Sequence, residues 1–295
     1  MVTTFKEVET ARQAYLKKIW KYCLIGGVSL VAITILSLGA FLVLWPATLF
    51  LVALFFYLAF GSKERANYYK IYKAYFVEKG LRKVFELTKY DHALGINKSV
   101  LDAVGMINTG DRYSSNDYVA GRYKDARFEQ ADVHIETETR DSKGNVHYYT
   151  IFRGRWMIFE FPKKFDFRLE VVEKGFRAAR TPKNGRGFER VEVESPEFNQ
   201  LFRIYAEDGF EMFYLLDPSL IHNITEIGQK YKGKLLLCFV DNKLHIGMDD
   251  RKDAFEPPNV FSKLNEDTEN AKISEDMHLI TNFVDKLKLV KKIFQ

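Results

Sequence analysis

The chain has 295 residues, of which 28% are charged and 47% hydrophobic, and its formal net charge is +5. Residues 1–21 sum to +3 and residues 63–83 to +5, so the remainder carries −3. This distribution argues against a nucleic-acid-binding domain, which would need a basic face of its own. Cys23 and Cys238 have no Cys or His at metal-ligand spacing, which argues against a disulfide framework and a cysteine metal site.

The first predicted element is a helix within residues 1–21. Its apolar side chains recur at helical spacing, at Phe5, Val8, Tyr15, Leu16 and Ile19. This pattern is typical of an amphipathic helix on the cytoplasmic side of a membrane. The same stripe could instead pack against the folded domain, and the sequence does not separate these two arrangements.

Residues 22–62 contain no charged side chain. As one continuous helix they would rise about 60 Å, roughly twice the thickness of the hydrocarbon core of a bilayer. Pro46 disfavours a continuous helix, and Trp45 before it suits the headgroup region. We therefore predict a two-helix transmembrane hairpin, with spans at about 22–43 and 46–62 and its tip at residues 44–48.

Two alternatives to the hairpin fit less well. A single long kinked helix would need an extreme tilt to remain within the bilayer. A cleaved signal peptide does not fit, because the charged region before the apolar run is too long and no A-x-A site follows it.

Basic residues flank the predicted hairpin on both sides. Lys17, Lys18 and Lys21 precede it, and Lys63 and Arg65 begin a second basic stretch after it. Since Lys and Arg near the ends of spans stay on the cytoplasmic side, both termini are expected in the cytoplasm. The expected location is the cell membrane, as a multi-pass protein.

A juxtamembrane helix is predicted over residues 63–89. Tyr68, Tyr72, Tyr75 and Phe76 form one stripe on it. With the interleaved basic residues this stripe suggests an aromatic and basic collar at the membrane interface, although the aromatics could equally pack on the protein's own domain. The residues expected to contact lipid headgroups are Lys63, Arg65, Lys70, Lys73, Arg82 and Lys83.

Residues 90–295 are predicted to form a cytosolic domain that begins with strands. Alternating apolar and polar residues favour strands over 117–125, 131–139, 146–152, 155–161, 164–171 and 187–195. In the second of these, Val133, Ile135 and Thr137 are expected to face inward. Gly154 is expected to mark a bulge or bend between two strands.

The last part of the chain is more helical. Asp208 and Glu211 have the spacing of a capping box, and Asp217-Pro218 has the pattern of a second helix start. A strand pair with its turn at Asp241-Asn242 and a last helix at about 272–294 follow. Strands in runs, with helices toward the ends, favour a mainly antiparallel α+β fold over a parallel doubly wound sheet.

Three segments occur in order behind the predicted hairpin: "DYVAGRYKDARFEQADV", "FRGRWMIFEFPKKFDFRLEV" and "ESPEFNQLFRIYAEDGFEMFYLLDP". In this order they resemble the bacterial two-span membrane family known as domain of unknown function 3137. The resemblance implies two membrane spans and a cytosolic α+β domain, and it brings no catalytic residues. The matching positions have structural interpretations as bends, core aromatics, a cap and a helix start: Gly121, Gly154, Phe198, Phe202, Asp208 and Pro218.

A search for catalytic motifs finds none. The six histidines stand in no zinc-binding motif, and neither a nucleophile elbow nor a Walker loop is present. "KNGRG" (183–187) lacks the strand and helix of a phosphate loop, so a basic hairpin turn is favoured. Glu207, Asp208 and Glu211 could do acid–base chemistry, but helix capping explains two of them. No catalytic, cofactor-binding or metal-binding residue is therefore predicted, and no cofactor.

These observations favour a non-enzymatic binding or scaffold module. We expect an integral inner-membrane protein that presents its cytosolic domain to a protein or lipid partner and rests on an anionic inner leaflet. The alternative is a membrane-associated enzyme whose site is assembled from residues distant in the sequence. A pore-forming oligomer fits least, because the spans contain no ionisable residue for an ion pathway.

Overall fold

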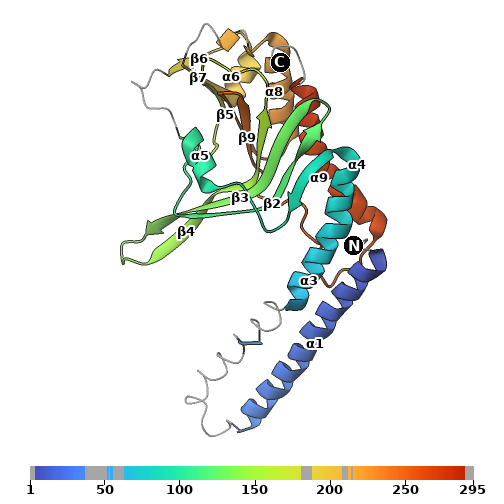
Figure 1. Cartoon of the computed structure of the whole chain (residues 1–295). Coiled ribbons are helices and arrows are strands. Elements are labelled where there is room, and N and C mark those ends of the chain that lie inside the picture. Colours follow the sequence, from blue (N-terminus) through green and yellow to red (C-terminus); the bar gives the residue numbers. More distant parts are fainter. Residues whose placement is uncertain are drawn as a thin grey trace. The chain divides into compact units, whose positions relative to one another are not determined.

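The computed structural model describes residues 4–36, 52, 54–55, 63–180, 188–207, 212–213 and 215–289. The chain divides into two compact units. Unit 1 comprises Met1–Gly80 and Glu256–Ile273, and unit 2 comprises Leu81–Phe255 and Ser274–Gln295. The elements are labelled in Figure 1.

Unit 1 is helical in its described part. It contains α1 (Phe5–Leu36), α3 (Lys63–Tyr72), the π-helix η1 (Lys73–Glu78), the first two residues of α4 (Lys79–Val84) and the beginning of α9 (Glu266–Lys286). The predicted N-terminal helix and the described part of the first predicted span form a single helix, because α1 continues without a break through residue 21 to Leu36.

The N-terminal half of α1 packs on its own unit. Val8, Tyr15 and Ile19 are buried. The guanidinium of Arg12 donates to the carbonyl oxygens of Val260 at 2.7 Å and Ser262 at 3.1 Å. The sequence left open whether this helix lies on the membrane surface or packs against the folded protein. Its N-terminal half packs against the protein.

The aromatic stripe after the second predicted span is also buried in unit 1. Tyr68, Tyr72 and Phe76 are at most 1% exposed. The ring centroids of Tyr72 and Phe76 are 4.8 Å apart, and the hydroxyl of Tyr72 donates to Glu269 at 2.5 Å. The stripe therefore packs on the protein.

The predicted helix over 63–89 ends earlier than expected. The helical run stops at Val84, and Glu86–Asp91 form strand β1, which pairs with β2. The backbone hydrogen bonds of that pairing, which depend on residues far along the chain, override the helical spacing of Phe85 and Leu87.

Unit 2 is built on an antiparallel sheet. In the described residues the strand order is β1-β2-β3-β4-β9-β8-β5-β7-β6, and every neighbouring pair is antiparallel. The other strands are β2 (Arg112–Tyr123), β3 (Ala126–Arg140), β4 (Val146–Glu160), β5 (Leu169–Glu173), β6 (Glu189–Val191), β7 (Phe202–Ala206), β8 (Lys234–Val240) and β9 (Lys243–Asp249). The predicted mainly antiparallel α+β fold is confirmed.

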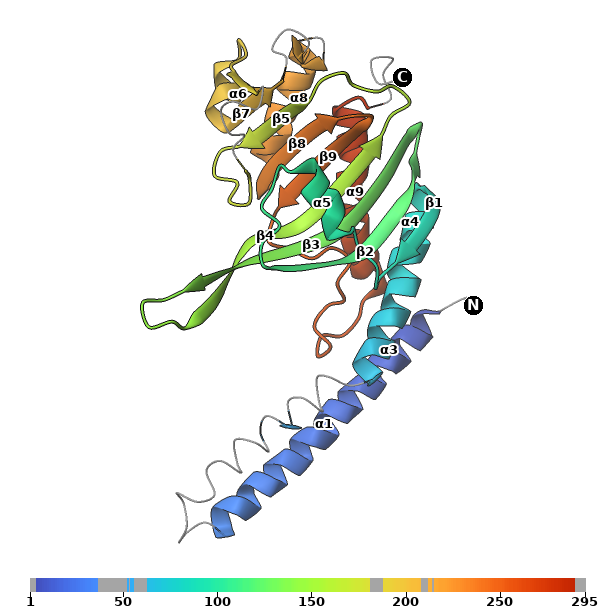
Figure 2. The same cartoon turned by 60° about the vertical axis from the view of Figure 1, so that its left-hand side comes forward.

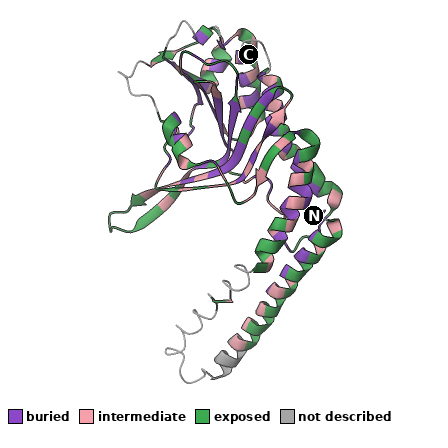
Figure 3. Ribbon diagram, in the orientation of Figure 1, coloured by how far each residue is buried: buried purple, intermediate pink, exposed green. Residues whose placement is uncertain are grey.

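Helices lie on both faces of this sheet. Figures 1 and 2 show α5 (Lys98–Val104) on one face and the C-terminal half of α9 on the other. This unit also contains α6 (Pro196–Leu201), α8 (Pro218–Lys230) and the last four residues of α4. Beneath α5 is a core that includes Val133, Ile135, Phe152 and Trp156, and the central strands are buried along much of their length (Figure 3).

One strand corrects the sequence prediction. Residues 146–160 form the single strand β4, which continues through Gly154, and Gly154 pairs in register with Val133. The bulge lies at Ile151 instead, because Phe152 pairs with Ile135 while Thr150 pairs with Glu136. An added Cβ at Gly154 would come within 2.0 Å of the Met248 carbonyl oxygen, so this glycine allows a close approach of β9.

The predicted transmembrane hairpin is described only in part. Residues 37–51, 53 and 56–62, which include its tip, lie outside the described residues. Of the helices that the structure describes, none combines the length and the hydrophobicity needed to cross a bilayer.

Candidate functional site

A groove of ≈ 680 Å³ opens on the face of the sheet that carries α5. Side chains alternate between the two faces of a strand, so Arg127 and Glu129 share a face with Ala131, which belongs to the core beneath α5. The groove and the core beneath α5 therefore lie next to each other on the same face of the sheet. Its lining residues come from five strands: Glu86, Leu87, Thr88, Ala120, Gly121, Arg122, Arg127, Phe128, Glu129, Ile158, Glu160 and Lys243.

A row of charged residues crosses the groove. The cross-strand pairs are Glu86 with Arg122, Arg122 with Arg127, Arg127 with Glu160, and Glu160 with Lys243. Directly opposite residues of an antiparallel pair have Cβ atoms about 4.5–5.5 Å apart. Within the described part of the chain, none of these neighbours approach to within 4.0 Å as an ion pair. Their charged groups remain available to a ligand.

The second row of the groove is less charged. Glu129 pairs with Ala120 on one side and Ile158 on the other. Burial, together with a hydrogen bond to Glu129, raises the pKa of the Tyr118 hydroxyl to about 12. The small Ala120 and the buried Ile158 give the groove an apolar floor between its charged walls.

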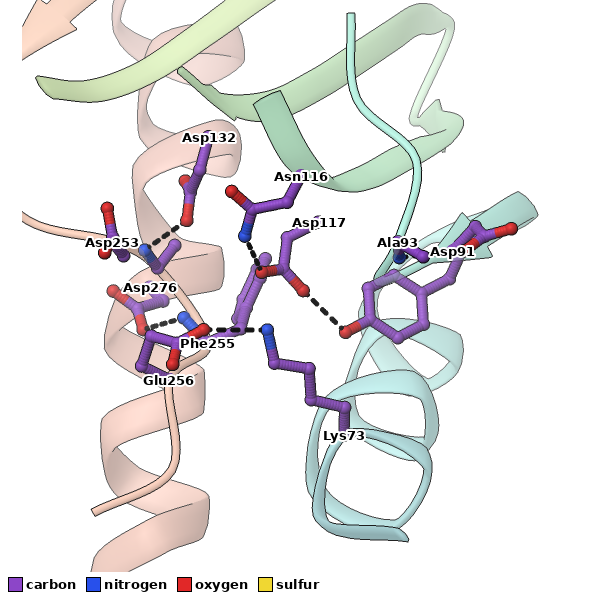
Figure 4. A network of polar contacts seen from close by, with 12 residues as sticks. Lys73, Asp91, Ala93, Asn116, Asp117, Asp132, Asp253, Phe255, Glu256 and Asp276 are labelled. Atoms are coloured by element: carbon purple, nitrogen blue, oxygen red, sulfur yellow. Dashed lines mark hydrogen bonds and ion pairs between the residues drawn. The ribbon is translucent and has the colours of Figure 1, made fainter. Parts of the chain in front are cut away.

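A buried acidic cluster occupies the opposite face of the sheet (Figure 4). Asp132 is 2% exposed, and one of its carboxylate oxygens accepts from the backbone N–H of Ala254 at 2.6 Å. Its other oxygen has no hydrogen-bond partner among the residues that the structure describes. Burial and then the negative charge of Asp117 raise the pKa of Asp132 well above its ordinary value. Burial and a neighbouring negative charge both disfavour the charged form of an acid, so Asp132 keeps its proton to a higher pH than an exposed aspartate does.

The neighbours of Asp132 are better satisfied. The hydroxyl of Tyr90 and the side-chain amide of Asn116 both donate to Asp117, at 3.0 and 2.7 Å. Asp117 has a φ of 56°, at a bulge where β2 changes register against β3. These contacts hold the Asp117 carboxylate within the structure.

A third set of reactive side chains is buried beneath the end of α5. Glu170, Cys238 and His245 are successive cross-strand neighbours on β5, β8 and β9, and each is at most 2% exposed. Burial raises the pKa of the Cys238 thiol above its usual range and lowers that of His245 to about 4. A buried thiol that keeps its proton is a poor nucleophile. We therefore interpret Cys238 as a structural residue of the core. In the described ranges, no three His, Cys, Asp or Glu side chains form a group able to hold a metal ion.

The basic residues proposed to contact lipid differ in exposure. Lys63, Arg65 and Lys70 of α3 are exposed, and the guanidinium of Arg65 lies over the ring of Tyr69. Lys73 is 4% exposed, and its ammonium pairs with Glu256 at 2.8 Å (Figure 4). The remaining two, Arg82 and Lys83, are exposed in unit 2. Lys73 is thus committed to a contact within the protein.

The described residues that the family resemblance singled out have roles in packing and in helix initiation. Phe198 and Phe202 are buried, with ring centroids 5.0 Å apart. Pro218 occupies the first turn of α8, where Asp217 accepts from the N–H of Leu220 at 2.7 Å. An added Cβ at Gly121 would come within 2.9 Å of the Glu86 carbonyl oxygen. Asp208 lies outside the described residues.

Sequence reasoning missed the charged row of the groove. The pairing of Arg122 with Arg127 could have been predicted from the sequence. A two-residue turn at Lys124-Asp125 places Tyr123 opposite Ala126, and hence Arg122 opposite Arg127. The other end of the row depends on the pairing of β4 with β9, which no local pattern indicates.

Comparison with known proteins gives one family. Residues 150–289 match the family model described as "Protein of unknown function (DUF3137)". This match supports the expected family. It covers just under half of the chain and includes β4, β9 and α9, but not the predicted hairpin.

The other comparisons add little. No curated protein matches the chain. Among solved structures, it is similar to the mycobacterial trehalose monomycolate transport factor A, TtfA, at 11% identity and a TM-score of 0.36. That similarity covers 75% of this chain and 94% of the other, but such a TM-score is too low to support an inference about fold or function.

Proposed function

We propose that this protein is an integral inner-membrane protein, with both termini in the cytoplasm, that presents a non-enzymatic binding module to a partner. The observation that carries the proposal is the uncharged stretch of residues 22–62, bounded by basic residues on both sides. A run of this length exceeds one span and suits two, and its basic flanks favour a cytoplasmic location for both ends.

The surface of α1 supports the anchoring. The side chains of Trp20, Leu24 and Val28 are 65–70% exposed. Large apolar side chains gathered on a surface usually mark a contact with another protein or with lipid. The same helix buries its apolar side chains nearer the N-terminus. The change along one helix is what we expect where it leaves the protein and enters a bilayer.

The contact between the two predicted spans also supports a hairpin. The ring of Phe55 lies against Gly26 of α1, where an added Cβ would come within 3.3 Å of it. Small residues at such contacts let transmembrane helices approach closely. We propose that Gly26 serves this purpose.

The groove on the sheet is the surface that we assign to binding. It combines charged side chains with the apolar Ala120 and Ile158. An enzyme would be expected to place a carboxylate of raised pKa in such a groove. Among the described residues, the carboxylates of raised pKa, Asp132, Glu170 and Asp249, do not line the groove, and this favours the binding module.

Cysteine labelling tests the topology. In a chain whose Cys23 and Cys238 are replaced by alanine, Ala47→Cys should react with an impermeant thiol reagent added to intact bacterial cells. The matched control is Ser114→Cys, at an exposed position of β2, which should react only after the cells are permeabilised. Extraction at alkaline pH should leave the protein in the membrane fraction. Labelling of the Ser114 variant in intact cells, or release by alkaline extraction, would overturn the proposal.

A further inference from the structure

Arg122 and Arg127 form a cross-strand pair of like charge. They are directly opposite on β2 and β3, next to the turn that joins these strands. Like charges in this position are destabilising. Neither guanidinium has an ion-pair partner within 4.0 Å among the described residues, so no close ion pair there offsets their repulsion.

The surroundings of the pair favour an anion between the two side chains. Both line the groove of ≈ 680 Å³, and Lys243 adds a third cation to its wall. Glu86 and Glu160 stand on the outer sides of the arginines, and Glu129 lies in the second row, so the two arginines are the adjacent like charges at the centre of the row.

We propose that Arg122 and Arg127 together bind a phosphate group of the ligand that occupies the groove. This inference rests on the proposed function, in which the groove is the binding surface. A planar guanidinium can donate two parallel hydrogen bonds to an oxyanion. A phosphate offers more oxygens and more negative charge than a carboxylate, so both guanidiniums can bind it at once.

The phosphate can belong to a soluble molecule or to a lipid headgroup. A phosphate monoester carries about 1.5 to 2 negative charges at pH 7 and inorganic phosphate more than one, whereas the diester of a lipid headgroup carries one. Two arginines are the better match for the dianion. The groove is therefore expected to prefer the soluble form, and titration with both kinds of probe tests this preference.

The experiment uses the full chain in micelles of a neutral detergent, titrated with inorganic phosphate and with glycerophosphoglycerol. Binding is followed by calorimetry and by the unfolding temperature. Phosphate should bind and raise the unfolding temperature, and Arg122→Gln or Arg127→Gln should each weaken binding about tenfold. Arg140→Gln is the matched control, because Arg140 lies on the same strand at the end far from the groove.

The variants also separate a ligand site from ordinary ion pairing. In phosphate-free buffer, the two glutamine variants should unfold at or above the wild-type temperature, because they relieve repulsion. Glu86→Gln and Glu160→Gln should bind phosphate more tightly than the wild type. If phosphate has no effect on the wild type, or if all four variants lose stability without phosphate, the arginines are paired with the glutamates and the proposal is wrong.

The two probes then identify the source. Stronger binding of inorganic phosphate supports a soluble ligand, and stronger binding of the diester overturns that preference while it retains the arginine site. Failure of the cysteine-labelling experiment would remove the membrane anchor but leave phosphate binding unaffected. Absence of phosphate binding with the expected labelling would refute this inference alone.

Discussion

Asp132 and Arg155 are directly opposite on β3 and β4, yet the guanidinium of Arg155 pairs with Asp250 at 3.1 Å and Asp276 at 3.5 Å. The charge of Arg155 lowers the pKa of Asp132, but burial and the charge of Asp117 outweigh it. Asp132 is therefore an acid of raised pKa beside an arginine that is already paired, and this relationship leads to two predictions.

Replacement of Asp132 by Asn should stabilise the protein at neutral pH. The folded state binds the proton of Asp132 more tightly than the unfolded chain, whose Asp pKa is about 3.9. The contribution of Asp132 to the stability of the wild type must therefore fall as the pH rises above that value toward the folded-state pKa. Asparagine can still accept from Ala254 and has no charge to bury. Unfolding in detergent between pH 4 and 8 should show the advantage of the variant growing with pH. A pH-independent difference would contradict the raised pKa.

Removal of the Arg155 side chain should lower the free energy of unfolding substantially. The side chains of Arg155 and Asp250 are 8% and 3% exposed, and loss of one partner of a buried ion pair costs about 3–5 kcal/mol. We expect a loss of this size for Arg155→Leu. The control is Arg153→Gln, whose ion pair with Asp253 is more exposed and should change stability by about 0–1 kcal/mol. Denaturant unfolding of the two variants measures the difference, and equal losses would refute a buried network.

The sequence predicted the parts of the fold that depend on local patterns. The alternation of residues 131–139 placed Val133 and Ile135 inward, and both belong to the core beneath α5. The same alternation assigned the even-numbered face to solvent. Asp132 is buried there, because the opposite face of the sheet is covered as well. A period-two pattern reports one buried face and cannot show what covers the other.

The boundary of the helix after the second predicted span was wrong for a related reason. The apolar stripe continues through Phe85 and Leu87, so the sequence favours a helix up to residue 89. Residues 86–91 instead pair with β2, whose partner residues are 118–122. Strand pairing with distant residues is absent from any local window, and it decided both this boundary and the charged row of the groove.

Gly154 provides a test of the close approach between β4 and β9. A Cβ at this position would come within 2.0 Å of the Met248 carbonyl oxygen and 3.0 Å of an Asp250 carboxylate oxygen. Because the first contact is with backbone, rotation of a side chain cannot relieve it. Gly154→Ala should therefore destabilise by about 1–3 kcal/mol or more, measured by thermal unfolding.

Gly144 is the matched control for Gly154. It lies in the β3–β4 turn with a φ of 83° and nothing within 4 Å of an added Cβ. Asparagine tolerates this backbone region better than other side chains do, so Gly144→Asn should change stability by less than about 0.5 kcal/mol. Equal losses in the two variants would show that the contact with Met248 is not the cause of the effect at Gly154.

Lys70 and Lys73 provide a paired test of the basic helix. They lie within one helical turn of each other in unit 1, but Lys70 is exposed, whereas Lys73 is 4% exposed and paired with Glu256. An amine-reactive acetylating reagent, read by mass spectrometry, should modify Lys70 readily in the detergent-solubilised chain and Lys73 poorly. Lys73→Gln should lower stability by about 1–3 kcal/mol because it leaves a carboxylate without its partner, and Lys70→Gln should have little effect.

The same reagent tests the lipid contact of Lys70. In nanodiscs of anionic lipid, Lys70 should become protected relative to nanodiscs of neutral lipid, since a basic residue near an anionic surface gains roughly 1 kcal/mol. Exposed charges are screened beyond about 8 Å at physiological salt, so added salt should restore the modification. The protection of Lys73 should be the same in detergent and in both lipids. Equal modification of Lys70 in the two lipids would mean that the basic residues of α3 do not contact the leaflet and act only to set the orientation of the spans.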